Sequence, residues 1–327
     1  MARLRALYLL TYADSRATGP KAFNDWTARL QAELFDKAMN ILESGSLFPP
    51  HAVQKMLRTR DRVRSLAERA NLSRERVEAW LEHMPPRYTL TVTAEDIVWH
   101  LGLVVELEAA LEDEARRLSP ERAGRGVAVL ASRPAEDGAW EVVFAARDQT
   151  GLFATVAGVL SLHGLNIFAA DAFSWRDGTA LSVFRVSEPP DPLYAHEFWS
   201  RVRGALKYAL LGKLSLDYRL DKQRGSPLAN QAQTPGMDLS VRVNVDNAVT
   251  DFYTVIEVQA PDRLGLLYEI AHTLQMLRVD IHHSRVVTHG ARAMDVFYVR
   301  DVHGQKVEDD VQAREIREAL LHRLTRT

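Results

Sequence analysis

The apolar positions of the chain follow two different periods, and the change between them divides the sequence. Up to about residue 120 the apolar side chains recur every three or four residues, which is the spacing of amphipathic helices. The pattern predicts helices from about Leu4 to Gly19, over 21–43 and 52–70, after Ser73, and after Thr93. The last of these carries one apolar stripe, formed by Ile97, Leu101, Val104, Leu111, Ala115 and Leu118. We therefore expect an all-α N-terminal region.

Beyond Gly124 the apolar residues alternate instead, as in half-buried strands. The order strand, strand, helix, strand, strand, helix then occurs twice. The first copy is predicted over 127–131, 140–146, 152–163, 166–175, 179–186 and 194–211. The second copy is predicted over 241–245, 253–259, 266–277, 280–288, 293–300 and 309–324. Each copy predicts an antiparallel four-stranded sheet with two helices, and its edge strand comes from the N-terminal side.

The two copies also share a sequence signature. ARDQTGLFATVAGVLSLHGLNI in the first copy matches APDRLGLLYEIAHTLQMLRVDI in the second without a gap, at a constant offset of 114 residues (262 − 148 = 114). A repeat of this kind indicates two copies of one small fold. The predicted regions are 1–122 (helical), 123–211 (first copy), 212–239 (a flexible linker rich in Gln, Gly, Pro and Asn) and 240–327 (second copy).

The repeated D-x-x-G-L junction, between a strand and a helix, carries the candidate chemistry. Glycine lets the backbone approach a ligand, and a helix N-terminus favours a carboxylate. An Asp or Asn at the start of the next strand can accept hydrogen bonds from the amino group of a small amino acid. The alternative is structural, with Asp capping the helix and Gly relieving a turn. The candidate effector-binding residues are Asp148, Thr150, Gly151, Leu152, Asn166, Ile167, Asp262, Leu264, Gly265, Leu266, Asp280 and Ile281.

Composition narrows the class of protein. The 41 basic and 43 acidic side chains give a net charge of −2, which favours neither a nucleic acid nor a membrane partner. The absence of Cys excludes disulfides and a cysteine nucleophile. No apolar run is long enough to span a bilayer, and the apolar start is too short for a signal peptide. We expect a cytoplasmic protein.

The repeats resemble ACT domains, which bind amino acids between paired copies. The run YTVIEVQAPDRLGLLYEIAHTL, with VRVNVDNAVTDFYTV, MPPRYTL and LYLLTYADSRATGP, resembles the C-terminal part of the bacterial bifunctional PII-protein uridylyltransferase/uridylyl-removing enzymes. The resemblance implies an α+β fold: an all-α remnant of an HD-type phosphohydrolase domain followed by two ferredoxin-like ACT domains. It also implies glutamine as effector and the PII signalling protein as partner.

The departures from that family concern catalysis. The family's nucleotidyltransferase site needs a Gly-Ser helix start with a carboxylate pair, and its hydrolase site needs a His-Asp pair. Neither constellation is present. Asp14 alone matches a family metal ligand, and we expect it to be orphaned. No catalytic residue and no cofactor is therefore predicted for this chain alone, although the full enzymes use Mg or Mn.

Other candidates favour structural roles. His282 and His283 are adjacent on a strand and face opposite sides, so they cannot chelate one metal together. The basic helix face (Arg58, Arg60, Arg62 and Arg64) is expected to be solvated or paired with acidic helices. Arg278 stands where the first copy has Gly164, so the second helix must end without glycine.

Three hypotheses follow. The first is a truncated regulatory portion that senses glutamine or another small amino acid in nitrogen regulation. The second is a free-standing amino-acid sensor that acts through a partner protein. A complete metal phosphohydrolase is disfavoured because its ligands are missing. The two ACT-like copies could pair within one chain or across a homodimer.

Overall fold

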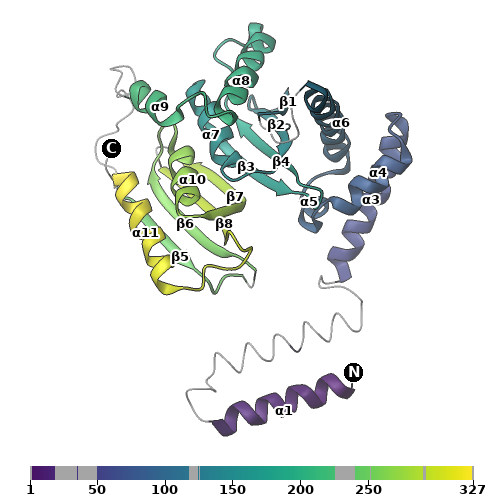
Figure 1. The fold of residues 1–327 in the computed structure, drawn as a ribbon, viewed down its shortest axis with the longest axis vertical. Coiled ribbons are helices and arrows are strands. Elements are labelled where there is room, and N and C mark those ends of the chain that lie inside the picture. Colours follow the sequence, from purple (N-terminus) through teal and green to yellow (C-terminus); the bar gives the residue numbers. More distant parts are fainter. Residues whose placement is uncertain are drawn as a thin grey trace. The chain divides into compact units, whose positions relative to one another are not determined.

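A computed structural model describes residues 2–18, 35, 50–117, 124, 126–224, 240–250, 252–289 and 292–325. The chain forms two compact units, the first of Met1–Leu81 with Pro86–Ile97 and the second of Glu82–Pro85 with Val98–Thr327. Among the described residues up to 117, the helices are α1 (Ala2–Thr18), α3 (Pro50–Arg69), α4 (Arg74–His83), α5 (Pro86–Thr91) and α6 (Ala94–Arg117) (Figure 1). The predicted all-α region is confirmed, except that the short helix α5 was not predicted and the helix expected over 21–43 lies outside the described residues apart from Phe35, which is helical.

The start of α6 follows from local side-chain chemistry. The hydroxyl of Thr93 accepts the backbone N–H of Asp96 at 3.2 Å and donates to the Asp96 carboxylate at 2.6 Å. This satisfies one of the unpaired N–H groups of the first turn. The predicted apolar stripe is buried at Ile97, Leu101 and Val104.

The strands form two separate antiparallel sheets, in the orders β1-β2-β4-β3 and β5-β6-β8-β7. The first contains β1 (Ala128–Pro134), β2 (Trp140–Arg147), β3 (Ile167–Ser174) and β4 (Thr179–Val186). The second contains β5 (Arg242–Asp246), β6 (Thr254–Pro261), β7 (Val279–His289) and β8 (Arg292–Asp301). In each sheet the strand that comes first in the chain is an edge strand, which confirms the predicted fold.

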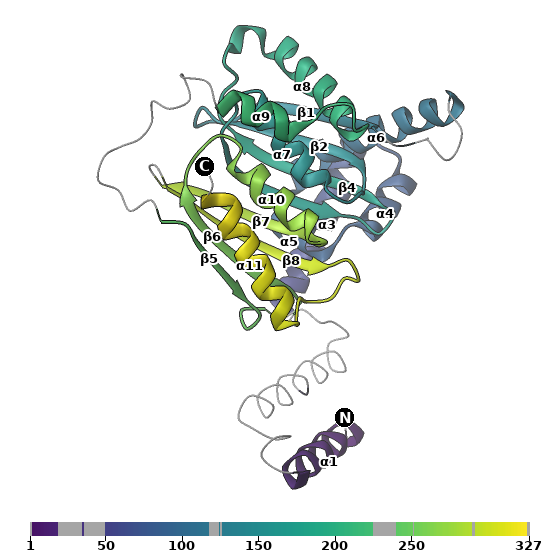
Figure 2. The same ribbon diagram turned by 60° about the vertical axis from the view of Figure 1, so that its left-hand side comes forward.

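Two helices cover the same face of each sheet (Figure 2). They are α7 (Leu152–Leu162) and α8 (Ala195–Leu210) on the first sheet, and α10 (Leu266–Met276) and α11 (Asp310–Thr325) on the second. The inward faces of sheets and helices form one core in which Phe184 and Phe297 are fully buried at equivalent positions. Burial of this apolar surface is the main favourable term of folding.

The repeat extends to backbone irregularities. Gly151 and Gly265 precede α7 and α10 with identical left-handed dihedral angles (φ 80°, ψ 7°). The register of β3 shifts between Ile167 and Ala169, and that of β7 shifts between Ile281 and His283. A bulge at the same place in both copies re-aims the side chains at the start of each strand.

The two domains pair within this chain through equivalent elements. Edge strand β3 lies beside edge strand β7, and α7 lies beside α10 (Figure 1). The hydroxyl of Ser284 donates to the carbonyl of Ala170 at 3.1 Å, and these residues occupy the same position in the two repeats (284 − 170 = 114). Contact between equivalent residues is the mark of a two-fold relation. Within this chain the two copies therefore form an intramolecular pair, as one of the two expected arrangements has it.

The approach of α7 to α10 depends on a residue without a side chain. A Cβ atom added at Gly158 would lie 2.7 Å from Cδ2 of Tyr268 and 2.9 Å from Cδ1 of Leu216. Leu216 belongs to α9 (Leu216–Arg224), which also contacts α7. Glycine therefore allows a bulky aromatic ring of the second domain to pack directly on the first.

Helix α9 corrects part of the predicted linker. Its residues were expected to be flexible, but Leu216 and Leu220 are four residues apart and buried in the shared core. An apolar pair at this spacing stabilises a helix against a neighbouring apolar surface. The remainder of the predicted linker, 225–239, lies outside the described residues.

The ends of the two central helices provide a matched test of backbone strain. Arg278 has φ 57° where Gly164 has φ 79°, and this region disfavours residues that have a Cβ. We expect Arg278→Gly to raise the free energy of unfolding by about 0.5–1 kcal/mol, measured by urea denaturation. Gly164→Ala should lower it by about 1 kcal/mol, since a Cβ there touches no other group within 4 Å and only the backbone is strained. Opposite signs for either variant would contradict this assignment.

Candidate functional site

The first crevice lies where the two domains meet. Its lining includes six of the predicted site residues, together with the end of α10. Those six are Asp148, Thr150, Gly151, Leu152, Asp280 and Ile281. The D-x-x-G-L loop of the first domain therefore faces the start of β7 from the second domain.

The second crevice repeats this arrangement with the domains exchanged. It contains the other six predicted residues, namely Asn166, Ile167, Asp262, Leu264, Gly265 and Leu266. All twelve residues are thus gathered in two related crevices, while their role in binding stays a prediction.

The structure corrects one detail of the sequence argument. Asn166 and Asp280 were expected near the loop of their own domain, but each lines the crevice with the loop of the other domain. The reason is the side-by-side pairing of β3 and β7, which carries the start of each strand past the boundary between the domains. Each crevice is complete only when both domains are paired.

Both crevices combine a helix N-terminus with carboxylates. Helices α7 and α10 begin at the loop, so their first N–H groups and dipoles favour a negative group there. Across the first crevice, burial raises the pKa of Asp280 most, the charge of His282 lowers it, and the nearby Asp148 raises it again. Groups of both signs on a ligand can therefore be recognised.

The two crevices differ in the charge of one lining residue. Ser182 lines the first crevice, and Asp295 occupies the corresponding strand position in the second. Ser182 pairs with Phe144, and Asp295 pairs with Val258, which is the equivalent of Phe144. Sequence reasoning missed Asp295. Its signal was present, because it alternates with Ala293, Phe297 and Val299 on the buried face of β8.

Asp295 is a buried carboxyl group with an incomplete set of partners. Its side chain is 2% exposed, and among the described residues its Oδ1 atom has no hydrogen-bond partner. Burial and the neighbouring charge of Asp262 raise the pKa of Asp295 to about 7, while a hydrogen bond from the backbone of Val287 opposes the shift. Burial also raises the pKa of Asp262. The second crevice therefore holds two neighbouring carboxyl groups, and the ionisation of one disfavours the ionisation of the other.

Two other sequence candidates, His283 and Asp14, line neither crevice. His283 Nδ1 lies 2.7 Å from Oδ1 of Asp171, and the His283 ring stacks on Tyr298. Asp14 is exposed on α1. Within the described part of the chain, no group of three or more His, Asp or Glu side chains is placed to hold a metal ion.

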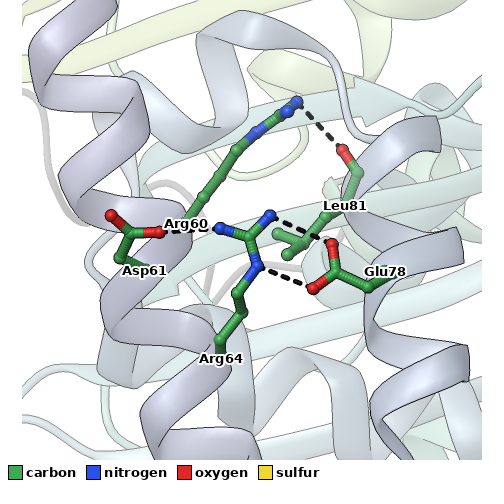
Figure 3. Close-up of polar contacts among 5 residues, drawn as sticks. All are labelled: Arg60, Asp61, Arg64, Glu78 and Leu81. Carbon is green, nitrogen blue, oxygen red and sulfur yellow. Dashed lines mark hydrogen bonds and ion pairs between the residues drawn. The ribbon is translucent and has the colours of Figure 1, made fainter.

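The basic face of α3 forms ion pairs with neighbouring helices. Arg64 donates to both carboxylate oxygens of Glu78, at 2.7 and 3.0 Å, and to Asp61 at 2.7 Å (Figure 3). Arg60 donates to the carbonyl of Leu81 at 3.0 Å, and Arg62 lies 3.2 Å from Glu95. The expected pairing with acidic side chains is confirmed for Arg62 and Arg64, whereas Arg60 bonds to a backbone carbonyl instead.

The fold and the paired crevices define a tandem ACT-like domain pair. A family model described as an ACR9-like, ACT-like domain matches residues 242–327. The described residues include no helix that could cross a membrane.

Comparison with known proteins extends the similarity to nearly the whole chain. Bifunctional uridylyltransferase/uridylyl-removing enzymes of Gluconobacter oxydans, Rhodospirillum rubrum and Azospirillum brasilense are 33%, 33% and 32% identical over 98–99% of it. The chain spans about a third (32–33%) of the length of these relatives. The resemblance to the C-terminal part of this family is thereby confirmed. Among solved structures, an aspartate kinase from Synechocystis is 18% identical in sequence, with a TM-score of 0.32. The alignment covers 68% of this chain and 33% of the kinase chain.

The raised pKa of Asp295 predicts a pH-dependent effect of Asp295→Asn. The folded protein keeps this proton up to about pH 7, whereas the unfolded chain loses it near the ordinary value of 3.8, so stability falls as pH rises between them. We expect the variant to match the wild type near pH 4 and to be more stable by roughly 2–4 kcal/mol at about pH 8. Urea denaturation across this range measures the difference.

Ser182→Ala, the corresponding change in the first domain, is the control and should shift stability equally at every pH. A stability difference for Asp295→Asn that does not change with pH would contradict the assignment.

Proposed function

We propose that the paired domains bind a free α-amino acid, glutamine first among the candidates, in the crevices between them. The observation that carries this proposal is the convergence of a helix N-terminus and carboxylates at each crevice. A zwitterion offers the two complementary groups: its carboxylate suits the helix start, and its ammonium group suits the aspartates. The ACT-like match over 242–327 supports the same ligand class.

The proposed binding is regulatory, since each crevice needs both domains. The cavities have volumes of only about 40 and 20 Å³ in this form, which is room for water molecules but not for a whole amino acid. A ligand must therefore move the loop or the facing strand as it enters. An effector acts by binding one arrangement more tightly than another, and a change in the pairing of the domains is the direct consequence here.

The relatives suggest what such a change would control. Their name describes uridylyl transfer and uridylyl removal, and this chain spans a third of their length. We propose that amino-acid binding here sets the balance between those two reactions on the PII signalling protein, in an assembly that supplies the catalytic residues. The alternative is a sensor that transmits the signal by contacting a separate partner protein.

Isothermal titration calorimetry with a panel of amino acids tests the binding proposal. We expect glutamine to bind, and Asp262→Ala to weaken its binding by about tenfold or more through loss of a charge-assisted hydrogen bond. Glu188→Ala, an exposed acid on the loop after β4, is the matched control and should bind like the wild type. Absence of heat with every amino acid would refute the proposal.

An activity assay tests the catalytic expectation separately. Incubated with PII, UTP and Mg²⁺ or Mn²⁺, the purified chain should produce no uridylylated PII, because the residues for nucleotide chemistry are absent from its sequence. Turnover well above a protein-free blank would show that this expectation is wrong. The DNA upstream of Met1 then distinguishes the two hypotheses. An open reading frame that encodes the Gly-Ser and His-Asp motifs indicates a portion of an enzyme, and a promoter there indicates a separate sensor.

A further inference from the structure

The two crevices share a backbone plan but differ in the side chains that fill them. In the first, Gln275 reaches across from α10 to the glycine of the other domain's loop: a Cβ added at Gly151 would lie 2.1 Å from its Nε2 atom. The corresponding residue facing the second crevice is Ser161, which has only a hydroxymethyl group (275 − 161 = 114). The chain thus covers its first loop glycine with its own carboxamide.

The second crevice presents instead a carboxyl group that needs a counter-ion. Asp295 lines it, is 2% exposed, and leaves its Oδ1 atom without a partner among the described residues. Arg263, the one cationic side chain lining this crevice, donates through Nη2 to Glu269 at 2.5 Å, and its buried Nη1 atom has no hydrogen-bond partner among the described residues. No cation is among the groups that shift the pKa of Asp295. A buried carboxylate with no cation beside it is costly, and a cationic ligand removes that cost.

The size of the cavity indicates which part of a ligand reaches Asp295. Its volume of about 20 Å³ exceeds the 10–15 Å³ that one water molecule needs, and an –NH₃⁺ group is of similar size. Asp262, at the exposed rim, and Asn166 line the same crevice. A ligand can therefore place a small cationic end at the floor while the rest of it lies toward the rim.

We propose that Asp295 binds the primary ammonium group of the ligand, and that only the second crevice is loaded while Gln275 covers the first. This inference rests on the proposed amino-acid binding and names the residue and the crevice responsible. Free ammonium ion offers the same chemistry as the ammonium group of an amino acid, so the experiment must separate these two sources.

Calorimetry on the full chain, with glutamine and its desamino analogue glutaramic acid, tests the assignment. We expect one glutamine per wild-type chain, and a loss of affinity of about tenfold or more in Asp295→Asn. Glutaramic acid should bind more weakly than glutamine to the wild type, and about equally to wild type and variant. A merely structural role for Asp295 would weaken both ligands alike and would overturn the proposal.

Variants of the first crevice serve as matched controls. Ser182→Ala should keep the affinity for glutamine within about twofold, since the unloaded crevice contributes no contact. Gln275→Ala should raise the stoichiometry from one toward two by uncovering Gly151. Loss of binding in Ser182→Ala with none in Asp295→Asn would place the ligand in the first crevice and refute this inference while leaving the proposed function intact.

Thermal unfolding with ammonium chloride, against potassium chloride at equal concentration, separates the two sources of ammonium. If ammonium chloride stabilises the wild type but not Asp295→Asn, the free ammonium ion is sufficient for binding at Asp295. If ammonium chloride does not stabilise the wild type and glutamine binds, the bound ammonium group is that of the amino acid. If no amino acid of the panel binds and ammonium has no Asp295-dependent effect, both the proposed function and this inference fail.

Discussion

The side-by-side pairing of the edge strands β3 and β7 is the constraint on which the rest of the structure depends. At the centre of this contact Ser284 donates to Ala170, its own equivalent in the other repeat. Because equivalent residues meet there, each domain presents its loop to the other domain's strand. Neither crevice could be built by one domain, and any group that separates the strands alters both.

This arrangement explains how a small binding event could have a distant consequence. The helices α7 and α10 touch through Gly158 and Tyr268, so the core is continuous from one domain to the other. Packed cores of this kind have discrete arrangements rather than continuous deformations. A ligand that widens one crevice therefore has to shift the partner domain as a body. Because the two domains are separate segments of one chain, their crevices can carry different side chains, such as Gln275 in the first and Asp295 in the second.

Much of the fold could be predicted from the sequence because its signals are local. Alternating apolar residues placed the strands, and the constant offset of 114 residues placed the second domain. The prediction of a flexible linker was wrong at α9. The polar composition of the segment indicated a linker, whereas the apolar pair Leu216 and Leu220, four residues apart, is too short a pattern to indicate a helix by itself. The twelve crevice residues were found, but the exchange of Asn166 and Asp280 between domains was not, since pairing geometry is set by contacts far apart in the chain. Asp295 was not predicted because it lies on the buried face of β8, outside the repeated D-x-x-G-L loop.

Hydrogen–deuterium exchange with and without glutamine tests the central claim most directly, because it reports both sides of a crevice in one experiment. The account predicts protection of the loop at 262–266 together with the strand start at 166–170, two segments of different domains. Protection confined to segments of a single domain, or to surfaces outside both crevices, would contradict a ligand site built jointly by the paired domains.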